Sequence, residues 1–183
     1  VTSTSDDRSI LSFYKPIRAE LDRVEASLHE ASIGSFAGLS SLLSHVLGSP
    51  GKRIRPAVEI LSGKAFSEDS SDRLVLMGTA VELLHVATLI HDDTVDKSAL
   101  RRGRPTVSSA WGRDVAVLLG DYVFANSAVY VCNTNNVRAI KSFSETLMAL
   151  SSGELREIVS AFDWRQTRED YWERIKHKTA SLF

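Results

Sequence analysis

Hydrophobic side chains recur every three or four residues along most of this chain. The first apolar stripe consists of Ile10, Phe13, Ile17, Leu21, Val24 and Leu28, a spacing that indicates one face of an α-helix. Further helices are predicted over residues 36–47, 55–66, 72 to beyond 96, 106–132, 137–161 and 167–183. No segment alternates convincingly as a strand would, and no internal repeat is present. The pattern therefore predicts an all-α protein.

Polar and turn-forming residues separate these helices. A loop is predicted at Gly48-Ser49-Pro50-Gly51, and a break at Gly103-Arg104-Pro105. Thr106 is expected to cap the helix that follows the break. Thr167 with Asp170 three residues later has the spacing of a capping box for the last helix.

The composition is that of a soluble globular protein. The 183 residues are 43% hydrophobic and 25% charged, and their formal net charge of −1 gives no overall basic field for nucleic acid. Cys132 is the single cysteine, so the chain forms no internal disulfide and needs no oxidising compartment. We therefore expect one all-helical domain over residues 1–183, in the cytoplasm.

Two long apolar runs, 74–90 and 115–132, need a membrane test. Glu82 and His85 lie within the first run, and Asp121 and Asn126 within the second. Polar side chains at these depths would be costly in lipid. Both runs are therefore interpreted as buried central helices, with no transmembrane segment.

An aspartate cluster ends the first of these runs. In His91-Asp92-Asp93-Thr94-Val95-Asp96, the first and last aspartates are four residues apart, which places them on one helix face. Carboxylates this close repel one another, and Mg²⁺ would relieve the repulsion because it prefers oxygen ligands. A solvated acidic helix face is the alternative, but the position at the end of an apolar helix favours a functional site.

Two basic clusters accompany the aspartates. The first, Lys52-Arg53-Ile54-Arg55-Pro56, begins a helix, where backbone N–H groups favour anions; the second is Arg101-Arg102-Gly103-Arg104. Arginines beside aspartates can simply form ion pairs, but arginine is also a bidentate partner of phosphate. Two basic clusters and one metal site together indicate two anionic substrates, with a diphosphate held through Mg²⁺.

Two further candidate site residues have weaker support from the sequence. His85 precedes Asp92 by seven residues, which places it on the same helix face about 10 Å away. A lone histidine on an apolar helix is more often a hydrogen-bonded core residue. Lys178-Thr179 near the end of the chain carries little weight from spacing alone.

Taken together and in this order, the motifs resemble the trans-isoprenyl diphosphate synthases of the polyprenyl synthetase family. The matching stretches are 51–56, 81–85, 92–96, 101–103, 120–121 and 178–180. The resemblance implies a bundle of long antiparallel helices around a central cavity, incomplete here. It also implies a Mg²⁺-dependent, head-to-tail condensation of isopentenyl diphosphate with an allylic diphosphate, in an enzyme that is usually a homodimer.

The resemblance also assigns roles to residues. Asp92 and Asp96 would bind Mg²⁺, and Arg101 and Lys178 would contact the allylic diphosphate. Lys178 and Thr179 would lie near the allylic cation as catalytic residues. The isopentenyl diphosphate would be bound by Lys52, Arg55, His85 and Arg102.

Product length is the next property that the resemblance addresses. The positions five and four residues before the first aspartate line the pocket of the growing chain in this family, and here they are Ala87 and Thr88. Small residues leave the pocket open, so the expected product is longer than farnesyl, either geranylgeranyl or a longer polyprenyl chain.

One family feature is missing. The second aspartate-rich motif, which binds the remaining Mg²⁺ ions, does not occur after Arg101. We therefore expect these 183 residues to be the N-terminal portion of a longer polyprenyl synthetase domain, with negligible turnover by itself.

Three alternatives remain open. The chain could be a non-catalytic binding or regulatory subunit of a heteromeric prenyl synthase, although such subunits usually lose the aspartates or arginines retained here. A terpene cyclase would share the aspartates but not the basic loop at 52–56. A purely structural helical bundle would leave the coincidence of motifs unexplained.

Overall fold

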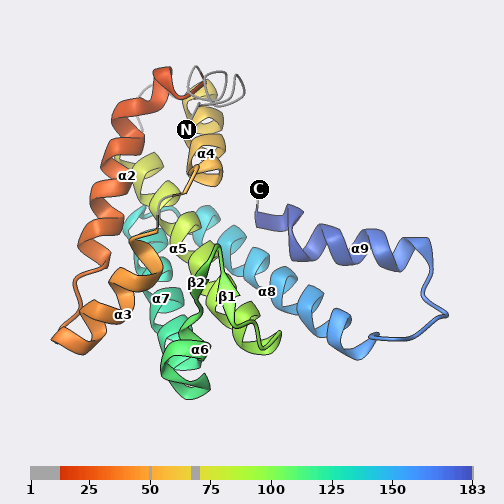
Figure 1. Cartoon of the computed structure of the whole chain (residues 1–183). Helices are drawn as coiled ribbons and strands as arrows, with labels where there is room; N and C mark the ends of the chain where they lie inside the picture. Colours follow the sequence, from red (N-terminus) through yellow and green to blue (C-terminus); the bar gives the residue numbers. More distant parts are fainter. Residues whose placement is uncertain (1–12, 50, 67–70, 183) are drawn as a thin grey trace, which may run out of the picture.

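The computed structural model describes residues 13–49, 51–66 and 71–182, which are mainly α-helical (Figure 1). A 3₁₀ turn (Lys15–Ile17) leads into α2 (Arg18–Ala31), α3 (Ala37–Leu47), α4 (Ile54–Phe66) and α5 (Ser71–Val95). A hairpin of β1 (Leu100–Arg101) and β2 (Arg104–Pro105) precedes α6 (Val107–Trp111), α7 (Arg113–Asn133), α8 (Val137–Val159), α9 (Arg168–Lys178) and a 3₁₀ turn (Ala180–Leu182). The prediction of an all-α fold is confirmed.

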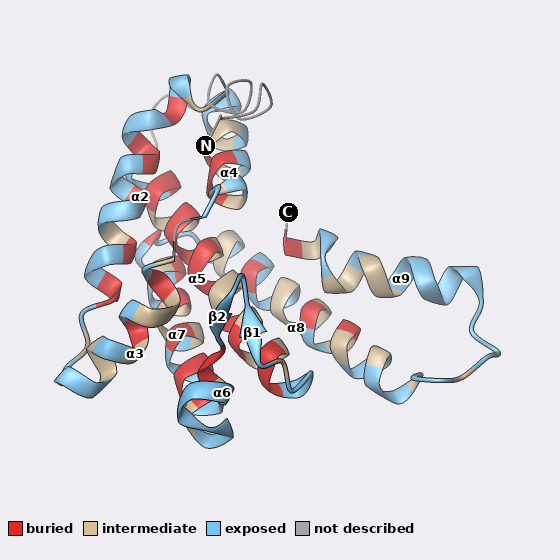
Figure 2. Ribbon diagram, viewed as in Figure 1, coloured by how far each residue is buried: buried red, intermediate tan, exposed pale blue. Residues whose placement is uncertain are grey.

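Helix α5 is the central element of the fold. It packs against α2, α4 and α7, and its residues Ala80, Leu83 and Leu84 are fully buried. Figure 2 shows the buried positions gathered on α5 and on the helix faces turned toward it. Since burying a leucine side chain contributes about 1.5–3 kcal/mol, Leu83 and Leu84 each stabilise the packing around α5 by an amount of this order.

Helices α5 and α7 are long and apolar enough to cross a membrane by length and composition. The most apolar window of α5 is 56% buried inside the protein, whereas that of α7 is 33% buried. Helix α5 therefore has the surroundings of a core helix, as predicted. Helix α7 buries one face and exposes Leu118 and Val129 on another.

The predicted helix over 106–132 is in fact two helices. Gly112 ends α6 and begins α7 with φ of 92°, a backbone conformation that glycine adopts without steric cost. Thr106 caps α6 as predicted, because its hydroxyl oxygen accepts a hydrogen bond from the Ser109 N–H at 3.2 Å. The expectation of one continuous helix here is wrong.

The two-residue strands were also not predicted. Leu100 pairs with Pro105 and Arg101 with Arg104 across a two-residue turn. Arg102 and Gly103 both have positive φ, 51° and 78°, as a type I′ hairpin turn requires. The hairpin is too short to show alternation in the sequence.

Several helix ends differ from the predictions. Helix α5 ends at Val95 instead of continuing beyond Asp96, because Lys97 has a positive φ of 53°. Helix α8 ends at Val159 instead of 161. Helix α9 ends at Lys178 and is followed by a 3₁₀ turn, so the helix expected over 167–183 is shorter. Of the first stripe, Ile10 lies outside the described residues, and α2 itself begins only at Arg18.

The α8–α9 pair extends to one side of the molecule (Figure 1). The predicted capping box at the start of α9 is present, since the Asp170 N–H donates to Thr167 Oγ1 and the Thr167 N–H donates to Asp170 Oδ2. The helices approach closely at Gly153, where a Cβ atom would lie 3.0 Å from the Lys178 backbone nitrogen. This contact places the end of α9 against α8.

Candidate functional site

A cavity of about 700 Å³ lies between α5, the start of α4 and the hairpin. Its walls combine apolar side chains from α5, including Val86, Leu89 and Ile90, with a concentration of basic groups. These basic groups are His45, Lys52, Arg53, Arg55, His85, Arg101, Arg102 and Arg104. Of the residues assigned to substrate contact from the sequence, Lys52, Arg55, His85, Arg101 and Arg102 line this cavity, whereas Lys178 does not.

The segment before α4 brings the first basic cluster to this cavity. The Tyr14 hydroxyl donates a hydrogen bond to the Lys52 carbonyl at 2.5 Å. This bond holds the segment against the 3₁₀ turn that precedes α2. Lys52 is exposed at the cavity wall. Arg55 lies in the first turn of α4, where burial lowers its guanidinium pKa and the nearby Glu82 carboxylate opposes that effect.

Arg53, between these two residues, points to carboxylates. Its Nε and Nη2 donate to Glu25 on α2 at 2.5 and 3.1 Å, and its Nη1 donates to Glu82 on α5 at 2.8 Å. The side chain is only 13% exposed. Arg53 therefore links three elements, a role that the sequence did not reveal.

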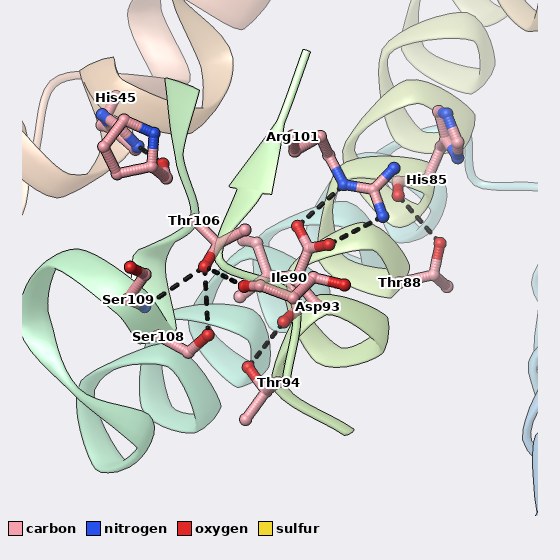
Figure 3. A network of polar contacts seen from close by, with 12 residues as sticks. His45, His85, Thr88, Ile90, Asp93, Thr94, Arg101, Thr106, Ser108 and Ser109 are labelled. Atoms are coloured by element: carbon pink, nitrogen blue, oxygen red, sulfur yellow. Dashed lines mark hydrogen bonds and ion pairs between the residues drawn. The ribbon is translucent and has the colours of Figure 1, made fainter. Parts of the chain in front are cut away.

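His85 lies at the cavity wall and not in the apolar core. Burial, together with the positive charges of Arg55, Arg102 and Arg101, lowers its pKa to about 4. The imidazole is therefore neutral at neutral pH and can donate one hydrogen bond and accept another. The Thr88 hydroxyl donates to the His85 carbonyl at 2.8 Å (Figure 3).

The hairpin brings the second basic cluster over the cavity. Arg101 forms a two-point ion pair with Asp93, shown in Figure 3, in which Nε donates to Oδ2 at 2.7 Å and Nη2 to Oδ1 at 2.8 Å. The Arg104 guanidinium bonds to His45 on α3 and to Ser49, which follows α3. The ion-pair interpretation of the arginines is thus correct for Arg101, which nevertheless stays 40% exposed at the cavity.

The aspartates of the cluster separate into two environments. Asp93 is buried against the hairpin, whereas Asp92 is half-buried and Asp96 is exposed. Burial and the charges of Glu154 and Asp96 raise the Asp92 pKa to about 6, against the opposing charges of Lys178 and Arg101. Neither Asp92 nor Asp96 lines the large cavity itself.

A divalent cation fits the donor chemistry of Asp92 and Asp96. Their carboxylates lie one helical turn apart, since the Asp96 N–H bonds to the Asp92 carbonyl at 2.8 Å, and a cation would offset their repulsion. Within the described residues, no group of three His, Cys, Asp or Glu side chains is placed to hold a metal. Mg²⁺ commonly takes one or two carboxylates and completes its shell with water and substrate phosphates, so two aspartates suffice.

Lys178 lies across from the aspartates at the end of α9. Its Nζ is 2.9 Å from Glu154 and 2.7 Å from Glu157, both on α8. Burial opposes protonation of this amine, but the hydrogen bonds to Glu157 and Glu154 outweigh it and raise the Lys178 pKa. Thr179 follows as the exposed C-cap of α9.

The two residues assigned to product length lie on different surfaces of α5. Ala87 is 2% exposed and belongs to the main apolar core. Thr88 is half-buried and, by its spacing, shares a helix face with His85 and Asp92. Neither residue lines the large basic cavity.

Sequence reasoning missed the acidic partners of the basic groups. Glu82 was visible only as a charge inside an apolar run, a signal that a buried carboxylate needs a cation. Asp93 appeared to be a third member of the metal cluster. Glu154 and Glu157 carried no motif signal, because only the packing of α9 on α8 brings them to Lys178.

The arrangement combines three kinds of chemical group in one region of the fold. Basic side chains surround one cavity, apolar side chains complete its wall, and a carboxylate pair suited to Mg²⁺ lies on the same helix. Arginine side chains are suited to phosphate groups and paired carboxylates to Mg²⁺, so this all-helical fold carries the donor groups that a phosphate ester with an apolar substituent requires.

Comparison with known proteins gives the family. The model of the polyprenyl synthetase family matches residues 37–183. A prenyl transferase of Cyanophora paradoxa is 35% identical over 95% of this chain and 54% of its own length. Heptaprenyl diphosphate synthase component 2 of Bacillus subtilis is 32% identical over 92% of this chain and 48% of its own. The chain belongs to the polyprenyl synthetase family.

Solved structures agree with this assignment. Heptaprenyl diphosphate synthase from Staphylococcus aureus superposes with a TM-score of 0.84 at 36% identity, covering 90% of this chain and 52% of that one. A polyprenyl synthase from Caulobacter crescentus, complexed with calcium and isoprenyl diphosphate, gives 0.88 at 29% identity, covering 95% and 53%. The chain therefore spans about half the length of these relatives.

Proposed function

We propose that the protein is a prenyltransferase that condenses isopentenyl diphosphate with an allylic diphosphate, head to tail, to give a longer trans-polyprenyl diphosphate. The observation that carries the proposal is the convergence of Lys52, Arg55, His85, Arg101 and Arg102 on one cavity. These residues come from three separate segments of the chain. A structural helical bundle would gain nothing from gathering so many like charges.

Each diphosphate has its own set of residues in this proposal. Lys52, Arg55, His85 and Arg102 bind isopentenyl diphosphate, because they line the cavity at the start of α4 and at the tip of the hairpin. Arg101 and Lys178 contact the allylic diphosphate. Both influence the pKa of Asp92, which indicates that they lie near the metal-binding end of α5.

The reaction needs no side-chain nucleophile. The allylic C–O bond breaks, the isopentenyl double bond attacks the resulting cation, and the departing diphosphate accepts the released proton. Arg101 and Lys178 stabilise the charge that develops on the leaving diphosphate, and Thr179 lies beside Lys178 to face the cation. The apolar wall of Val86, Leu89 and Ile90 excludes water from the cation.

Asp92 and Asp96 would hold Mg²⁺. When bound, this ion supplies charge neutralisation and orientation of the allylic diphosphate. The assignment is supported by the placement of the two carboxylates one turn apart at the end of α5, where a divalent cation would favour the ionised form of both. The calcium and isoprenyl diphosphate complex of the Caulobacter relative is further support.

The product is proposed to be longer than farnesyl. The side chain of Thr88 is small and leaves room for an extended chain on the α5 face of His85 and Asp92, and Ala87 is the small residue beside it in the core. Relatives named heptaprenyl and solanesyl diphosphate synthases support a long product. A geranylgeranyl product is the shorter alternative, because one similar structure is named a geranylgeranyl pyrophosphate synthase.

Residues 1–183 are proposed to be the N-terminal portion of a longer domain, which supplies the second aspartate-rich motif. This is supported by the coverage of about half of each relative. By itself the segment would then turn over negligibly, since half of the metal site is missing.

We also propose a cytoplasmic homodimer. Most apolar residues of α5 are buried within the chain, so α7 offers the available apolar face, with Leu118 at 69% and Val129 at 55% exposed. A heteromeric assembly is the second candidate, because the Bacillus relative is named as component 2 of a synthase. A purely non-catalytic subunit is disfavoured by the retained Asp92 and Arg102.

The test is a transfer assay with the full-length protein. Radiolabelled isopentenyl diphosphate is incubated with geranyl, farnesyl or geranylgeranyl diphosphate and Mg²⁺, and the extracted products are separated by chromatography. We expect elongated products that disappear with Asp92→Asn and with chelator. Absence of product with every primer, while the protein still binds both diphosphates in calorimetry, would favour the non-catalytic alternative.

A further inference from the structure

Gly120-Asp121 on α7 is one of the stretches in which the sequence resembles its family, but the proposed function gives it no role. Gly120 is buried where α7 packs along α5, and the ring of His91 lies directly over it. A Cβ atom on Gly120 would overlap His91 Nε2 and would lie 2.5 Å from its Cδ2 and 3.0 Å from its Cε1. Any larger residue at this position would therefore push the imidazole away from α7.

The imidazole of His91 also bonds to α7. Its Nε2 lies 3.3 Å from the Val117 carbonyl oxygen and 3.3 Å from Asp121 Oδ1. Both of these oxygens are acceptors, so we assign the ring proton to Nε2, which donates to both. Neither contact is strong by itself, because the His91 and Asp121 side chains are 38% and 64% exposed. Together with the space above Gly120, however, they leave the ring a single position.

The metal-binding face of α5 lies between two fixed side chains. Successive residues of an α-helix are rotated by about 100° around its axis, so Asp92 and Asp96 point between the directions of their neighbours at 91 and 93. His91 on one side is fixed to α7. Asp93 on the other side is fixed to Arg101 of the hairpin, through hydrogen bonds of 2.7 and 2.8 Å. Rotation of this end of α5 in either direction would therefore break one of these contacts.

The two contacts position different elements. The hairpin has strands of only two residues, so the pair of Asp93 with Arg101 determines where the hairpin lies. Helix α7 is 21 residues long and shares one apolar core with α5, so it is the firmer support. The contact of His91 with α7 therefore determines how the end of α5 itself is rotated.

We propose that Gly120 and Asp121 are positioning residues for the metal-binding end of α5. They hold the imidazole of His91 and thereby fix the direction in which the Asp92 and Asp96 carboxylates point. The inference rests on the proposed function, in which these two carboxylates hold Mg²⁺. It adds three residues that act through the metal ligands and not on the substrate.

The experiment is a double-mutant cycle in the full-length protein. Gly120→Ala should raise the Mg²⁺ concentration for half-maximal activity about tenfold, the lower end of the loss seen when groups that orient metal ligands are changed. His91→Ala should raise it by a similar factor, because the ring that contacts α7 is gone. The double variant should need no more Mg²⁺ than His91→Ala, since the new methyl group then occupies the space that the imidazole has left.

Two further readouts distinguish positioning from a general loss of packing. The KM for isopentenyl diphosphate should stay at the wild-type value in these variants, because neither His91 nor Gly120 lines the basic cavity. Asp121→Asn should raise the Mg²⁺ requirement less than Asp121→Ala, because the amide oxygen still accepts a hydrogen bond from His91 Nε2.

Gly63→Ala is the matched control. Gly63 on α4 is also a helical glycine at which a Cβ atom would overlap a side chain of α5, in this case Leu74 Cδ2. Leu74 precedes Asp92 by about five helical turns, so this variant should unfold at a lower temperature and keep the wild-type Mg²⁺ requirement. If Gly63→Ala raises the Mg²⁺ requirement as much as Gly120→Ala, or if the two changes of the double variant add, loss of packing alone is responsible and the inference is wrong.

Calorimetry separates this inference from the proposed function. Binding of Mg²⁺ in the presence of inorganic pyrophosphate is measured for the same variants and does not depend on turnover. An inactive wild type whose Mg²⁺ affinity still changes in the expected order would refute the proposed function and retain the role of Gly120 and Asp121. An active wild type with equal Mg²⁺ affinity in all variants would do the reverse, and a wild type that neither binds Mg²⁺ nor turns over would refute both. Thermal unfolding of each variant verifies that it is folded.

Discussion

Asp93 on α5 and Arg101 on β1 bind each other through two parallel hydrogen bonds of 2.7 and 2.8 Å. The pair fixes the hairpin to the helix that carries Asp92, with Asp93 only 6% exposed. Because bidentate pairs set both distance and orientation, this contact determines where the basic hairpin lies over the cavity.

The first prediction concerns this pair. Asp93→Asn should lower the free energy of unfolding by about 1–3 kcal/mol, since it leaves Arg101 with a weaker, neutral partner. It should also reduce the transfer rate without changing the Mg²⁺ concentration for half-maximal activity, whereas Asp92→Asn should raise that concentration. Denaturant unfolding and Mg²⁺ titration measure the two effects.

Asp72→Asn is the control for the loss of one carboxylate charge. It breaks the exposed pair with Arg23 and should change stability by less than about 1 kcal/mol. A shift in Mg²⁺ requirement for Asp93→Asn as large as that for Asp92→Asn would show that Asp93 binds the metal directly.

The second prediction concerns Glu59 on α4, whose Oε2 is buried without a hydrogen-bond partner among the described residues. Burial raises its pKa from 4.5 to about 8. The folded protein then binds this proton more tightly than the unfolded chain, so stability falls as pH rises from 4.5 to 8 and levels off above. Glu59→Gln should remove that fall and be about 1–3 kcal/mol more stable than the wild type at pH 8.5.

Denaturant unfolding at pH 5 and 8.5 gives the comparison. Glu145→Gln on α8, at an exposed carboxylate 3.7 Å from Lys141, should retain the pH dependence of the wild type. If the free energy of unfolding depends on pH equally in Glu59→Gln and in the wild type, another group neutralises the Glu59 carboxylate.

The third prediction concerns the close approach of α8 and α9. Gly153→Ala places a Cβ 3.0 Å from the Lys178 backbone nitrogen and from His177 Cβ, and backbone atoms cannot rotate away. We expect the free energy of unfolding to fall by about 1–3 kcal/mol. We also expect weaker binding of the allylic diphosphate, because Lys178 moves away from Glu154 and Glu157. Thermal unfolding and the allylic KM measure both effects.

Ser152→Ala, one residue earlier in α8, serves as the control and should be nearly neutral. In an open helix, a Gly→Ala change would increase stability by up to about 1 kcal/mol. An increase for Gly153→Ala would therefore show that α9 does not pack here as described.

The fourth prediction concerns product length. Thr88→Phe should shorten the products, because an aromatic ring on the face shared with His85 and Asp92 narrows the space for the chain. Ala87→Phe should also shorten them, but at a cost of about 1–3 kcal/mol, because Ala87 is 2% exposed in a packed core. Product chromatography and unfolding separate the two effects. Unchanged products in both variants would remove these positions from the control of chain length.

Local patterns predicted much of the fold. The helical period on α2, the Thr106 cap and the Thr167–Asp170 capping box depend on neighbours within one or two turns, so they were readable without tertiary contacts. The break at Gly112 and the short hairpin were missed. A single glycine does not require a positive φ, and two-residue strands carry no periodicity.

The sequence by itself determined which chemical groups the site contains: aspartates one turn apart on an apolar helix, and arginines and a lysine in two basic clusters. Only the tertiary structure decided their pairing. Arg53 and Arg101 look equivalent to the other arginines in the sequence, but they face Glu82 and Asp93, whereas Lys178 meets Glu154 across the α8–α9 contact. The reason is physical: a charge interacts with whatever lies within a few ångströms, and packing brings together side chains that are remote along the chain.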